Sequence, residues 1–173
     1  MAAEPPRTLI SSSPESTRAL GAALGRRLPA GTLVALDGEL GSGKTCFVQG
    51  LARGLDVPCA VTSPTYALLQ TYPGRVDLHH FDAYMEGRER ALLMDGGLEW
   101  MGREGVAAVE WAGRVEDVLP LPRISVVLAH AGESRRRLSI SVLGEGPEAA
   151  RLAAILRALA AEGEIEAAGL VEE

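Results

Sequence analysis

The chain has 173 residues, a net charge of −6 and 47% apolar residues, which is typical of one globular domain with a sizeable core. The acidic balance argues against a DNA-binding protein, because nonspecific binding needs clustered Lys and Arg. We expect no membrane partner, since no apolar stretch approaches the roughly 20 residues of a membrane span. The N-terminus shows no signal-peptide pattern, and Cys46 and Cys59 have no metal-binding spacing. These features predict a cytoplasmic protein with reduced thiols.

The first part of the chain predicts alternating strands and helices. Residues 8–10 form a candidate strand, and a helix is expected at residues 14–28 with Ser13 as its N-cap. Residues 32–36 are almost entirely apolar, as in a buried central strand of a parallel sheet. A second helix is expected at residues 44–53. This order of elements predicts an α/β fold.

The remainder of the chain predicts two antiparallel hairpins, a further buried strand and a terminal helix. Residues 162–173 contain five Glu and no basic residue, so we expect a mobile acidic tail after a single domain at residues 1–161. The expected elements are antiparallel strands at 66–72 and 76–81, a helix at 86–94, a strand at 106–109, antiparallel strands at 124–128 and 137–143, and a helix at 147–161.

The segment Gly38-Glu39-Leu40-Gly41-Ser42-Gly43-Lys44-Thr45 matches the Walker A pattern completely, and it lies between an expected strand and an expected helix. Glycines let backbone N–H groups wrap a phosphate chain, and the positive end of the helix adds attraction. Lys44 is expected to contact the β- and γ-phosphates, and the Thr45 hydroxyl to ligate Mg²⁺. Residues 1–161 are therefore expected to be a P-loop ATPase domain. The expected nucleotide-binding residues of the loop are Glu39, Leu40, Gly41, Ser42, Gly43, Lys44, Thr45 and Cys46.

The alternative is a glycine-rich turn that carries a lysine by chance. Composition disfavours it, because Lys44 is the only lysine in a chain with 16 arginines, and the compact ammonium fits between phosphates where a guanidinium does not. The chain also contains no Asn. It therefore lacks the Asn-Lys-x-Asp element with which Ras-type GTPases bind guanine, and ATP is the expected nucleotide.

Further segments follow the loop in a characteristic order. They are Ser63-Pro64-Thr65-Tyr66, His80-Phe81-Asp82-Ala83-Tyr84, and Val109-Glu110-Trp111 followed by Leu119-Pro120. Together with the Walker A segment they span roughly residues 12–143, and the combination resembles the bacterial TsaE (formerly YjeE) family. The resemblance implies a P-loop NTPase-like α/β domain whose central parallel strands are flanked by antiparallel strands, which suits the two hairpins expected above.

The resemblance also implies a function, since the TsaE family is the ATPase component of tRNA N6-threonylcarbamoyladenosine (t6A) biosynthesis. ATP and Mg²⁺ are the implied cofactors. The implied protein partners are the threonylcarbamoyl transferase and its paralogous companion subunit, and tRNA is reached indirectly through that complex at adenosine 37. Hydrolysis would drive turnover of the transferase complex, with a low intrinsic rate that the partners stimulate.

Asp82 and Glu110 match the acidic positions of the family, and each follows an expected strand. We interpret Asp82 as the first choice of metal ligand, because Mg²⁺ takes one or two carboxylates and keeps several waters. Glu110 is a candidate to polarise the attacking water, and the sequence leaves the division of these roles open. For either acid alone the alternative is an ordinary surface carboxylate. The expected catalytic residues are Lys44, Asp82 and Glu110, and the expected metal ligands are Thr45, Asp82 and Glu110.

Thr65 matches a switch-like threonine that senses the γ-phosphate and the metal, and the alternative is a turn residue after a proline. Trp111 is most simply interpreted as a core or interface residue, although the resemblance places it beside the site. His79 and His80 alternate between faces of their strand, so they are poorly placed to bind one metal together. Both histidines are interpreted as structural.

The chain departs from the usual family pattern at Met85, where Arg is usual, so that Arg88 or Arg90 would have to supply its contacts. Alternatively, those contacts are absent from this chain. It also departs from the family pattern at Trp100-Met101. Two other functions use the same loop. One is a small-molecule or nucleotide kinase with an Arg-rich lid, for which residues 88–90 and 135–137 could be mistaken, although no pocket for a second substrate is evident. The other is a nonenzymatic switch in which ATP orders Thr65 and creates a docking surface.

Overall fold

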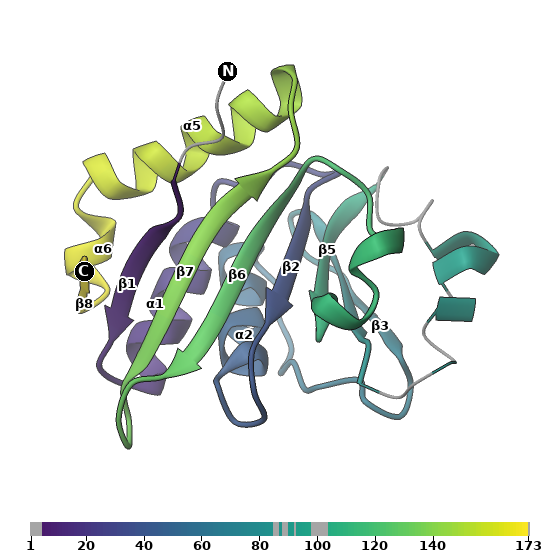
Figure 1. Ribbon diagram of the computed structural model, residues 1–173, viewed down its shortest axis with the longest axis horizontal. Coiled ribbons are helices and arrows are strands. Elements are labelled where there is room, and N and C mark those ends of the chain that lie inside the picture. Colours follow the sequence, from purple (N-terminus) through teal and green to yellow (C-terminus); the bar gives the residue numbers. More distant parts are fainter. Residues whose placement is uncertain (1–4, 85–86, 88–89, 92, 98–103, 173) are drawn as a thin grey trace.

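The computed structural model describes residues 5–84, 87, 90–91, 93–97 and 104–172, and within them eight strands form one sheet in the order β3-β4-β5-β2-β6-β7-β1-β8 (Figure 1). The four central strands β4, β5, β2 and β6 are parallel to one another, and the outer strands pair antiparallel. This arrangement confirms the expected α/β class with flanking antiparallel strands. The strands are β1 (Arg7–Ser11), β2 (Leu33–Asp37), β3 (Leu69–Tyr72), β4 (Asp77–Asp82), β5 (Gly105–Glu110), β6 (Arg123–His130), β7 (Arg136–Leu143) and β8 (Leu170–Glu172).

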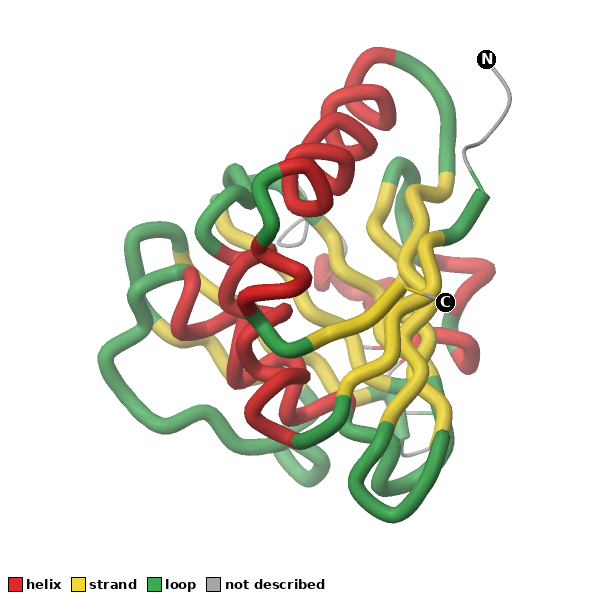
Figure 2. The backbone as a smooth tube through the Cα atoms, turned by 90° about the vertical axis from the view of Figure 1, so that its left-hand side faces the viewer, coloured by secondary structure: helices red, strands yellow, loops and turns green. Residues whose placement is uncertain are grey.

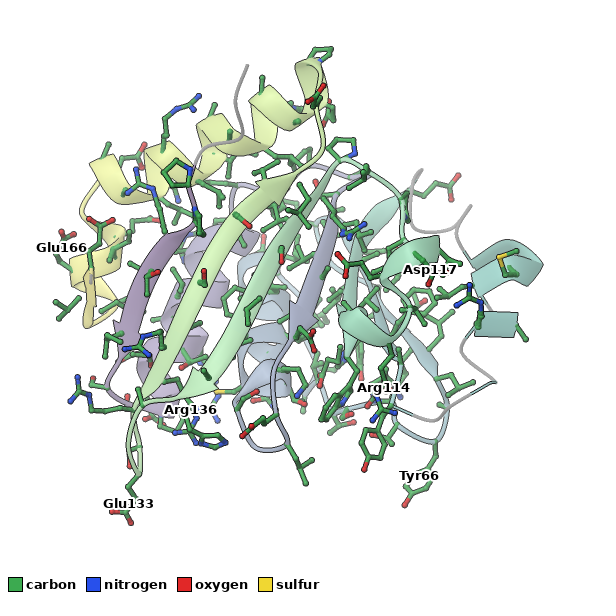
Figure 3. The ribbon with its side chains drawn as sticks, in the orientation of Figure 1. Tyr66, Arg114, Asp117, Glu133, Arg136 and Glu166 are labelled. Atoms are coloured by element: carbon green, nitrogen blue, oxygen red, sulfur yellow. The ribbon has the colours of Figure 1, made fainter. Side chains whose placement is uncertain are left out.

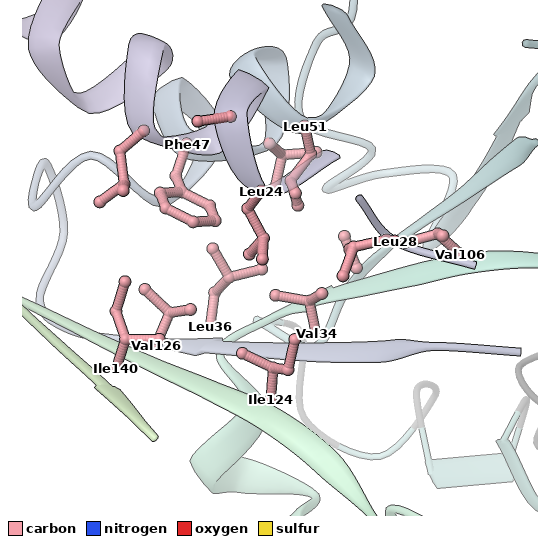
Figure 4. Packing of buried hydrophobic residues seen from close by; sticks show 14 of the residues in the cluster. Leu24, Leu28, Val34, Leu36, Phe47, Leu51, Val106, Ile124, Val126 and Ile140 are labelled. Carbon is pink, nitrogen blue, oxygen red and sulfur yellow. The ribbon is translucent and has the colours of Figure 1, made fainter. Parts of the chain in front are cut away.

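Strand β2 is buried on both sides, as its apolar sequence predicts. Val34 and Leu36 belong to one hydrophobic cluster and Leu33 and Ala35 to the other, because successive side chains point to opposite faces. The helices α1 (Pro14–Gly25), α2 (Lys44–Gly54) and α5 (Pro147–Ala161) contribute to the first cluster, whose packing is drawn in Figure 4. Short helices that follow β5, η2 (Ala112–Arg114) and η3 (Glu116–Val118), cover the second. Figure 2 shows helices on both sides of the sheet.

Glycines line the contact between α1 and α2. A Cβ added at Gly50 would lie 2.2 Å from the carbonyl oxygen of Arg18, and one added at Gly21 would lie 2.4 Å from that of Phe47. Both distances are far shorter than a carbon–oxygen contact allows, so the two backbones touch only because these side chains are absent. This close packing fixes α2, and with it the loop from which α2 begins. The glycines are Gly21 and Gly25 on α1, and Gly50 and Gly54 on α2.

The end of the chain differs from the expected mobile tail. Residues 164–167 form α6 (Glu164–Ala167), and β8 pairs antiparallel with β1 and extends the sheet. Ile165 and Leu170 are buried in the main cluster, and Arg27 pairs with Glu162 and Glu164. The glutamates that suggested a solvated tail therefore alternate with apolar anchors, and three of them, Glu162, Glu164 and Glu172, have basic partners.

Two further elements differ in extent from the prediction. Helix α1 ends at Gly25 rather than at residue 28, because the backbone N–H groups of Arg27 and Leu28 bond to carbonyls three residues earlier and tighten the last turn. The first hairpin strand begins at Leu69, since a turn closed by the Leu68 N–H and the Pro64 carbonyl occupies the preceding residues. Of the helix expected at 86–94, residues 86, 88, 89 and 92 lie outside the described residues. Residues 90 and 91 are helical, and residues 93–97 form a short π-helix, η1 (Leu93–Gly97).

No helix in the described part of the chain is both long enough and apolar enough to cross a membrane.

Candidate functional site

The carboxyl ends of the central strands meet at one edge of the sheet. Asp82 is the last residue of β4 and Glu110 the last of β5, and the two are direct register partners in the parallel ladder. Asp37 ends the neighbouring strand β2, and the Walker A loop follows it. Parallel α/β sheets bind ligands at this edge, so the topology brings the predicted acids and the predicted phosphate loop to one place.

The loop at residues 38–43 depends on glycine at both of its ends. Gly38 has φ of 139° and Gly43 has φ of 104°, which are left-handed values that favour glycine. A Cβ at Gly38 would also lie 2.2 Å from the carbonyl oxygen of Leu128. Asp37 accepts a hydrogen bond from the Gly38 N–H at 2.9 Å, which holds the start of the loop. Helix α2 begins directly after Gly43, so its unpaired N–H groups point into the loop.

The hairpin between β6 and β7 supports the loop from its outer side. Arg136 lies at the base of this hairpin (Figure 3) and donates a hydrogen bond to the Gly41 carbonyl at 3.2 Å. The His130 ring contacts the Leu40 carbonyl at 3.3 Å. Arg136 also bonds to the carbonyls of Gly132 and Glu133 within the hairpin. The phosphate loop is therefore held from the strand that precedes it and from the hairpin beside it.

Lys44 lies at the centre of the site and is buried, with 5% of its surface exposed. Its ammonium donates to the carbonyls of Gly38 at 2.7 Å and Glu39 at 2.9 Å. It also lies 3.6 Å from the centre of the Trp111 ring, which is a cation–π contact. Burial lowers the pKa of Lys44, and the nearby carboxylates, Glu110 foremost, oppose that shift. The sole lysine of the chain is thus a preorganised cation that faces the strand ends.

Glu110 connects two elements through its two carboxylate oxygens. Its Oε2 accepts a hydrogen bond from the Thr45 hydroxyl at 3.1 Å, and its Oε1 lies 2.9 Å from the His80 Nε2. Glu110 and His80 are both buried. The predicted metal-ligating hydroxyl and the predicted water-polarising acid therefore touch. The contact also places His80, which the sequence suggested to be structural, directly on a candidate catalytic carboxylate.

Asp82 holds the segment that contains Thr65. Its Oδ2 accepts hydrogen bonds from the hydroxyls of Ser63 and Thr65, both at 2.7 Å, and its Oδ1 accepts from the Tyr84 N–H at 2.9 Å. Asp82 is buried, at 3% exposure. Both of its oxygens thus accept hydrogen bonds from the protein, whereas a carboxylate that ligates a metal directly would have to give up at least one of these bonds. The sequence indicated Thr65 as a site residue, but Ser63 was not singled out.

Trp111 follows Glu110 and has a left-handed backbone, with φ of 59°. Such a conformation is uncommon for a bulky residue and is often found at functional sites. Its ring packs against Tyr84 with 5.0 Å between centroids, and the Arg114 guanidinium lies over both rings. Arg114 also donates to the Tyr84 carbonyl. No local sequence signal distinguishes this arginine, because Tyr84, to which it donates its hydrogen bond, lies 30 residues earlier in the chain.

Of the two arginines that were expected to replace the usual family arginine, the structure describes Arg90, and its ion pair lies outside this cluster. Arg90 pairs instead with Asp117 on the exposed surface. Met85, Arg88 and the Trp100-Met101 pair lie outside the described residues. Arg114 is therefore the described basic side chain that lies beside Tyr84.

These groups surround a cleft of about 420 Å³. Of the residues predicted to bind nucleotide, Glu39 and Ser42 do not line it: Glu39 contributes its carbonyl to Lys44, and the Ser42 side chain is buried within the loop. Tyr66 does not line the cleft and points away from the protein, at the lower right of Figure 3. The lining residues are Leu40, Gly41, Gly43, Lys44, Thr45, Cys46, Ser63, Thr65, Asp82, Tyr84, Glu110 and Trp111.

The donor set fits magnesium only together with a nucleotide. Mg²⁺ prefers hard oxygen ligands and is usually bound through one or two carboxylates, substrate phosphates and waters. Thr45, Asp82 and Glu110 supply such oxygens at the cleft. Within the described residues, no three or more His, Cys, Asp or Glu side chains form a group that could hold a metal. Phosphate oxygens would have to complete the coordination shell.

Comparison with known proteins decides the family. The model of the family described as "Threonylcarbamoyl adenosine biosynthesis protein TsaE" matches residues 11–138 of the chain. The chain belongs to the TsaE family. Curated TsaE proteins of Treponema pallidum and Nostoc are 36% and 38% identical to it over 132 and 131 residues, which cover 76% and 73% of this chain and 98% and 80% of those proteins. The TsaE of Bacillus subtilis is 35% identical over 134 residues, covering 76% of this chain and 83% of that protein.

A solved structure supports the same assignment. YdiB of Bacillus subtilis superposes with a TM-score of 0.76 at 26% identity, and the match covers 94% of this chain and 98% of that one. The fold is thus P-loop NTPase-like. Membership of the TsaE family places the chain in t6A biosynthesis on tRNA, and the family and the fold together indicate a nucleotide-binding protein.

Proposed function

We propose that this chain binds ATP with Mg²⁺ and hydrolyses it as a subunit of the tRNA t6A machinery. The observation that carries the proposal is the 3.1 Å hydrogen bond between the Thr45 hydroxyl and the Glu110 carboxylate. It joins the first turn of the Walker A helix to the end of a neighbouring parallel strand. In P-loop NTPases a hydroxyl at this position and a carboxylate at a strand end hold the metal that accompanies the phosphates.

The chain's own groups suit phosphoryl transfer to water. Backbone N–H groups at residues 38–43 would wrap the phosphate chain, and Lys44 would exchange its bonds to loop carbonyls for bonds to the β- and γ-phosphates. A bound Mg²⁺ would supply charge neutralisation between these phosphates. Glu110 would orient and polarise the attacking water, and Asp82 would act on the metal through water while it holds Thr65. Together these residues preorganise charge and position, which is the main source of catalysis in such reactions.

The partners follow from the same proposal. We infer that the chain works with the threonylcarbamoyl transferase and its paralogous companion subunit, that ATP hydrolysis drives turnover of their complex, and that tRNA is met through that complex. Cytoplasmic tRNA is the substrate of such machinery, so the proposal carries a cytoplasmic location. ATP is preferred to GTP because the chain, without Asn, cannot contain the guanine-binding element described above. A competition titration in which GDP matched or exceeded ADP would contradict this preference.

A nonenzymatic switch is a second candidate, and one observation favours it. The hydroxyls of Ser63 and Thr65 share one oxygen of Asp82, so a nucleotide-bound metal that attracted either group would rearrange this segment. An ATPase uses the same rearrangement, and the two functions differ in whether phosphate is released in a catalytic cycle.

The deciding experiment follows γ-labelled ATP in the presence of this chain, the two partner proteins, tRNA and a cytosolic metabolite extract. The ATPase proposal requires free labelled phosphate to accumulate over many turnovers, faster with the partners than without them. Bound, unhydrolysed ATP that nevertheless supports tRNA modification would establish the nonenzymatic switch. A labelled organic phosphate would establish a kinase.

A further inference from the structure

His80 occupies an unusual position for a histidine that only fills space. It lies in β4, two residues before Asp82, and its side chain is completely buried. Its Nε2 is 2.9 Å from Glu110 Oε1, whereas its Nδ1 has no hydrogen-bond partner among the described residues. Burying a ring nitrogen without a partner costs free energy that Leu or Phe at this position would avoid. Packing alone therefore does not explain an imidazole here.

The strand register explains how the ring reaches Glu110. His80 is paired with Ala108 in the parallel ladder, and Asp82 is paired with Glu110. Side chains two residues apart on a strand share a face, so these four side chains lie on the side of the sheet that carries α2. Ala108 has only a methyl group, which leaves room for the imidazole to extend diagonally to the carboxylate.

The contact defines what each carboxylate oxygen does. Because the carboxylate oxygen is an acceptor, His80 Nε2 carries the hydrogen of this bond. Glu110 Oε1 is thereby occupied, and Oε2 is directed toward the Thr45 hydroxyl. The terminal torsion of a glutamate is broad and has little intrinsic preference. A donor on one oxygen is therefore an effective way to fix the orientation of the other.

We propose that His80 is a positioning residue for Glu110, which it holds with Oε2 facing Thr45 and the nucleotide cleft during ATP hydrolysis. The inference rests on the proposed ATPase function and adds to it His80, which would affect hydrolysis by orienting Glu110. Outer contacts that orient a reacting carboxylate or metal ligand commonly change activity by about 10- to 100-fold. His80 does not line the cleft, so its loss should affect turnover without a matching change in ATP affinity.

The chain offers a matched control in the adjacent residue. His79 lies on the same strand, is also buried and faces the opposite side of the sheet, where its Nδ1 contacts the Thr71 hydroxyl at 3.0 Å. A His79→Gln variant therefore tests the general effect of losing a buried histidine from β4. For His80, Gln keeps an N–H donor near the position of Nε2, whereas Leu fills the space without a donor.

The experiment measures partner-stimulated phosphate release and ATP affinity by calorimetry for folded His80→Leu, His80→Gln and His79→Gln. We expect His80→Leu to lower the turnover rate by about 10- to 100-fold with ATP affinity within about twofold. His80→Gln should recover most of the rate, and His79→Gln should keep it. In a Glu110→Gln background, His80→Leu should cause little further loss, because both changes act on one unit.

Several outcomes would overturn the inference. They are full activity in His80→Leu, equal loss in His80→Gln, a matching loss of ATP affinity, or an independent loss in the Glu110→Gln background. If the wild-type protein is active and the His80 variants have the same turnover rate, only this inference is contradicted. If the wild-type protein shows no turnover, the proposed function itself is contradicted. A nitrogen-15 NMR spectrum adds a readout without turnover, since a His80 Nε2 that bears no hydrogen would also refute the assignment.

Discussion

Asp82 and Glu110 lie side by side as register partners at the ends of the parallel strands β4 and β5, but they hold different parts of the protein. Asp82 accepts hydrogen bonds from Ser63 and Thr65, and Glu110 accepts one from Thr45. One acid thus secures the segment that covers one side of the cleft, and the other secures the start of the Walker A helix. Both carboxylates are therefore needed to keep the two sides of the cleft in place.

Isosteric loss of either charge should impair hydrolysis more than nucleotide binding. On the proposed function, loop N–H groups and Lys44 would provide most of the affinity, and both are unchanged in Asp82→Asn and Glu110→Gln. We expect ATP to remain bound while phosphate release falls on the order of 100-fold in each variant. Partner-stimulated phosphate release and ATP calorimetry, measured on the same folded samples, check this. Full activity in both variants would return these acids to an ordinary structural role.

Lys44 should be essential for phosphate binding and dispensable for folding. Its ammonium bonds to two carbonyls of the loop, and burial lowers its pKa. Lys44 belongs to neither hydrophobic cluster, so Lys44→Ala removes a cation from the loop without removing a side chain of the core. We expect ATP affinity to fall steeply by calorimetry with an unchanged circular dichroism spectrum. Lys44→Arg should be nearly as harmful, because the planar guanidinium does not fit where the compact ammonium lies. Undiminished affinity in folded Lys44→Ala would refute the phosphate-loop assignment.

The two cysteines should differ in reactivity, and nucleotide should protect one of them. Cys46 lines the cleft, and burial raises the pKa of its thiol, an effect that Arg18 partly opposes. A raised pKa means less thiolate at pH 8, so Cys46 should be alkylated by iodoacetamide more slowly than the exposed Cys59. Raising the pH should accelerate its alkylation.

Addition of Mg²⁺ and ATP should slow alkylation of Cys46 further and leave Cys59 unaffected. Peptide mass spectrometry separates the two sites within one sample, so Cys59 is the internal control. Equal protection of both thiols would point to a global change rather than to occupancy of the cleft.

Alanine at Gly50 should destabilise the protein, although the same change usually stabilises a helix by about 1 kcal/mol. The added methyl group would lie 2.2 Å from the Arg18 carbonyl oxygen and force α1 and α2 apart, and such overpacking typically costs about 1–3 kcal/mol. Thermal unfolding should show a melting temperature lowered by several degrees. The control is Arg53→Ala on the exposed face of α2, which should leave the melting temperature nearly unchanged. A Gly50→Ala protein as stable as the wild type would show that the helices separate readily.

Local signals were sufficient to predict most of the fold and the phosphate loop. The local structure can be predicted from a few adjacent residues at the apolar run of β2, at the Ser13 cap and at the Walker A glycines. β8 escaped prediction because a strand of three residues exists only through its pairing with β1. A similar limit applies to His80, whose partner Glu110 lies 30 residues away, so its role depends on the register of two strands.

The site residues show the same distinction between local and tertiary information. The cleft is lined by most of the predicted loop residues, by Thr65 and by both acids. This grouping was predictable, because the resemblance to a family implied that these segments form one site. Arg114 belongs to none of the quoted segments, and Ser63 belongs to one without having been singled out as a site residue, so that both are recognised only from their contacts with Tyr84 and Asp82. The left-handed backbone of Trp111 could not be anticipated either, since the residue type disfavours it.

The glycine contact between α1 and α2 determines which side of the cleft is stationary. With the two backbones in direct contact, α2 can neither rotate about its axis nor slide along α1 without a collision. The Walker A loop is therefore anchored to the larger hydrophobic core through a rigid pair of helices. We expect nucleotide exchange to leave this half of the molecule in place and to displace the opposite wall. There, the hydroxyl–carboxylate bond of Thr65 and the exposed ring of Tyr84 can change position without repacking the core.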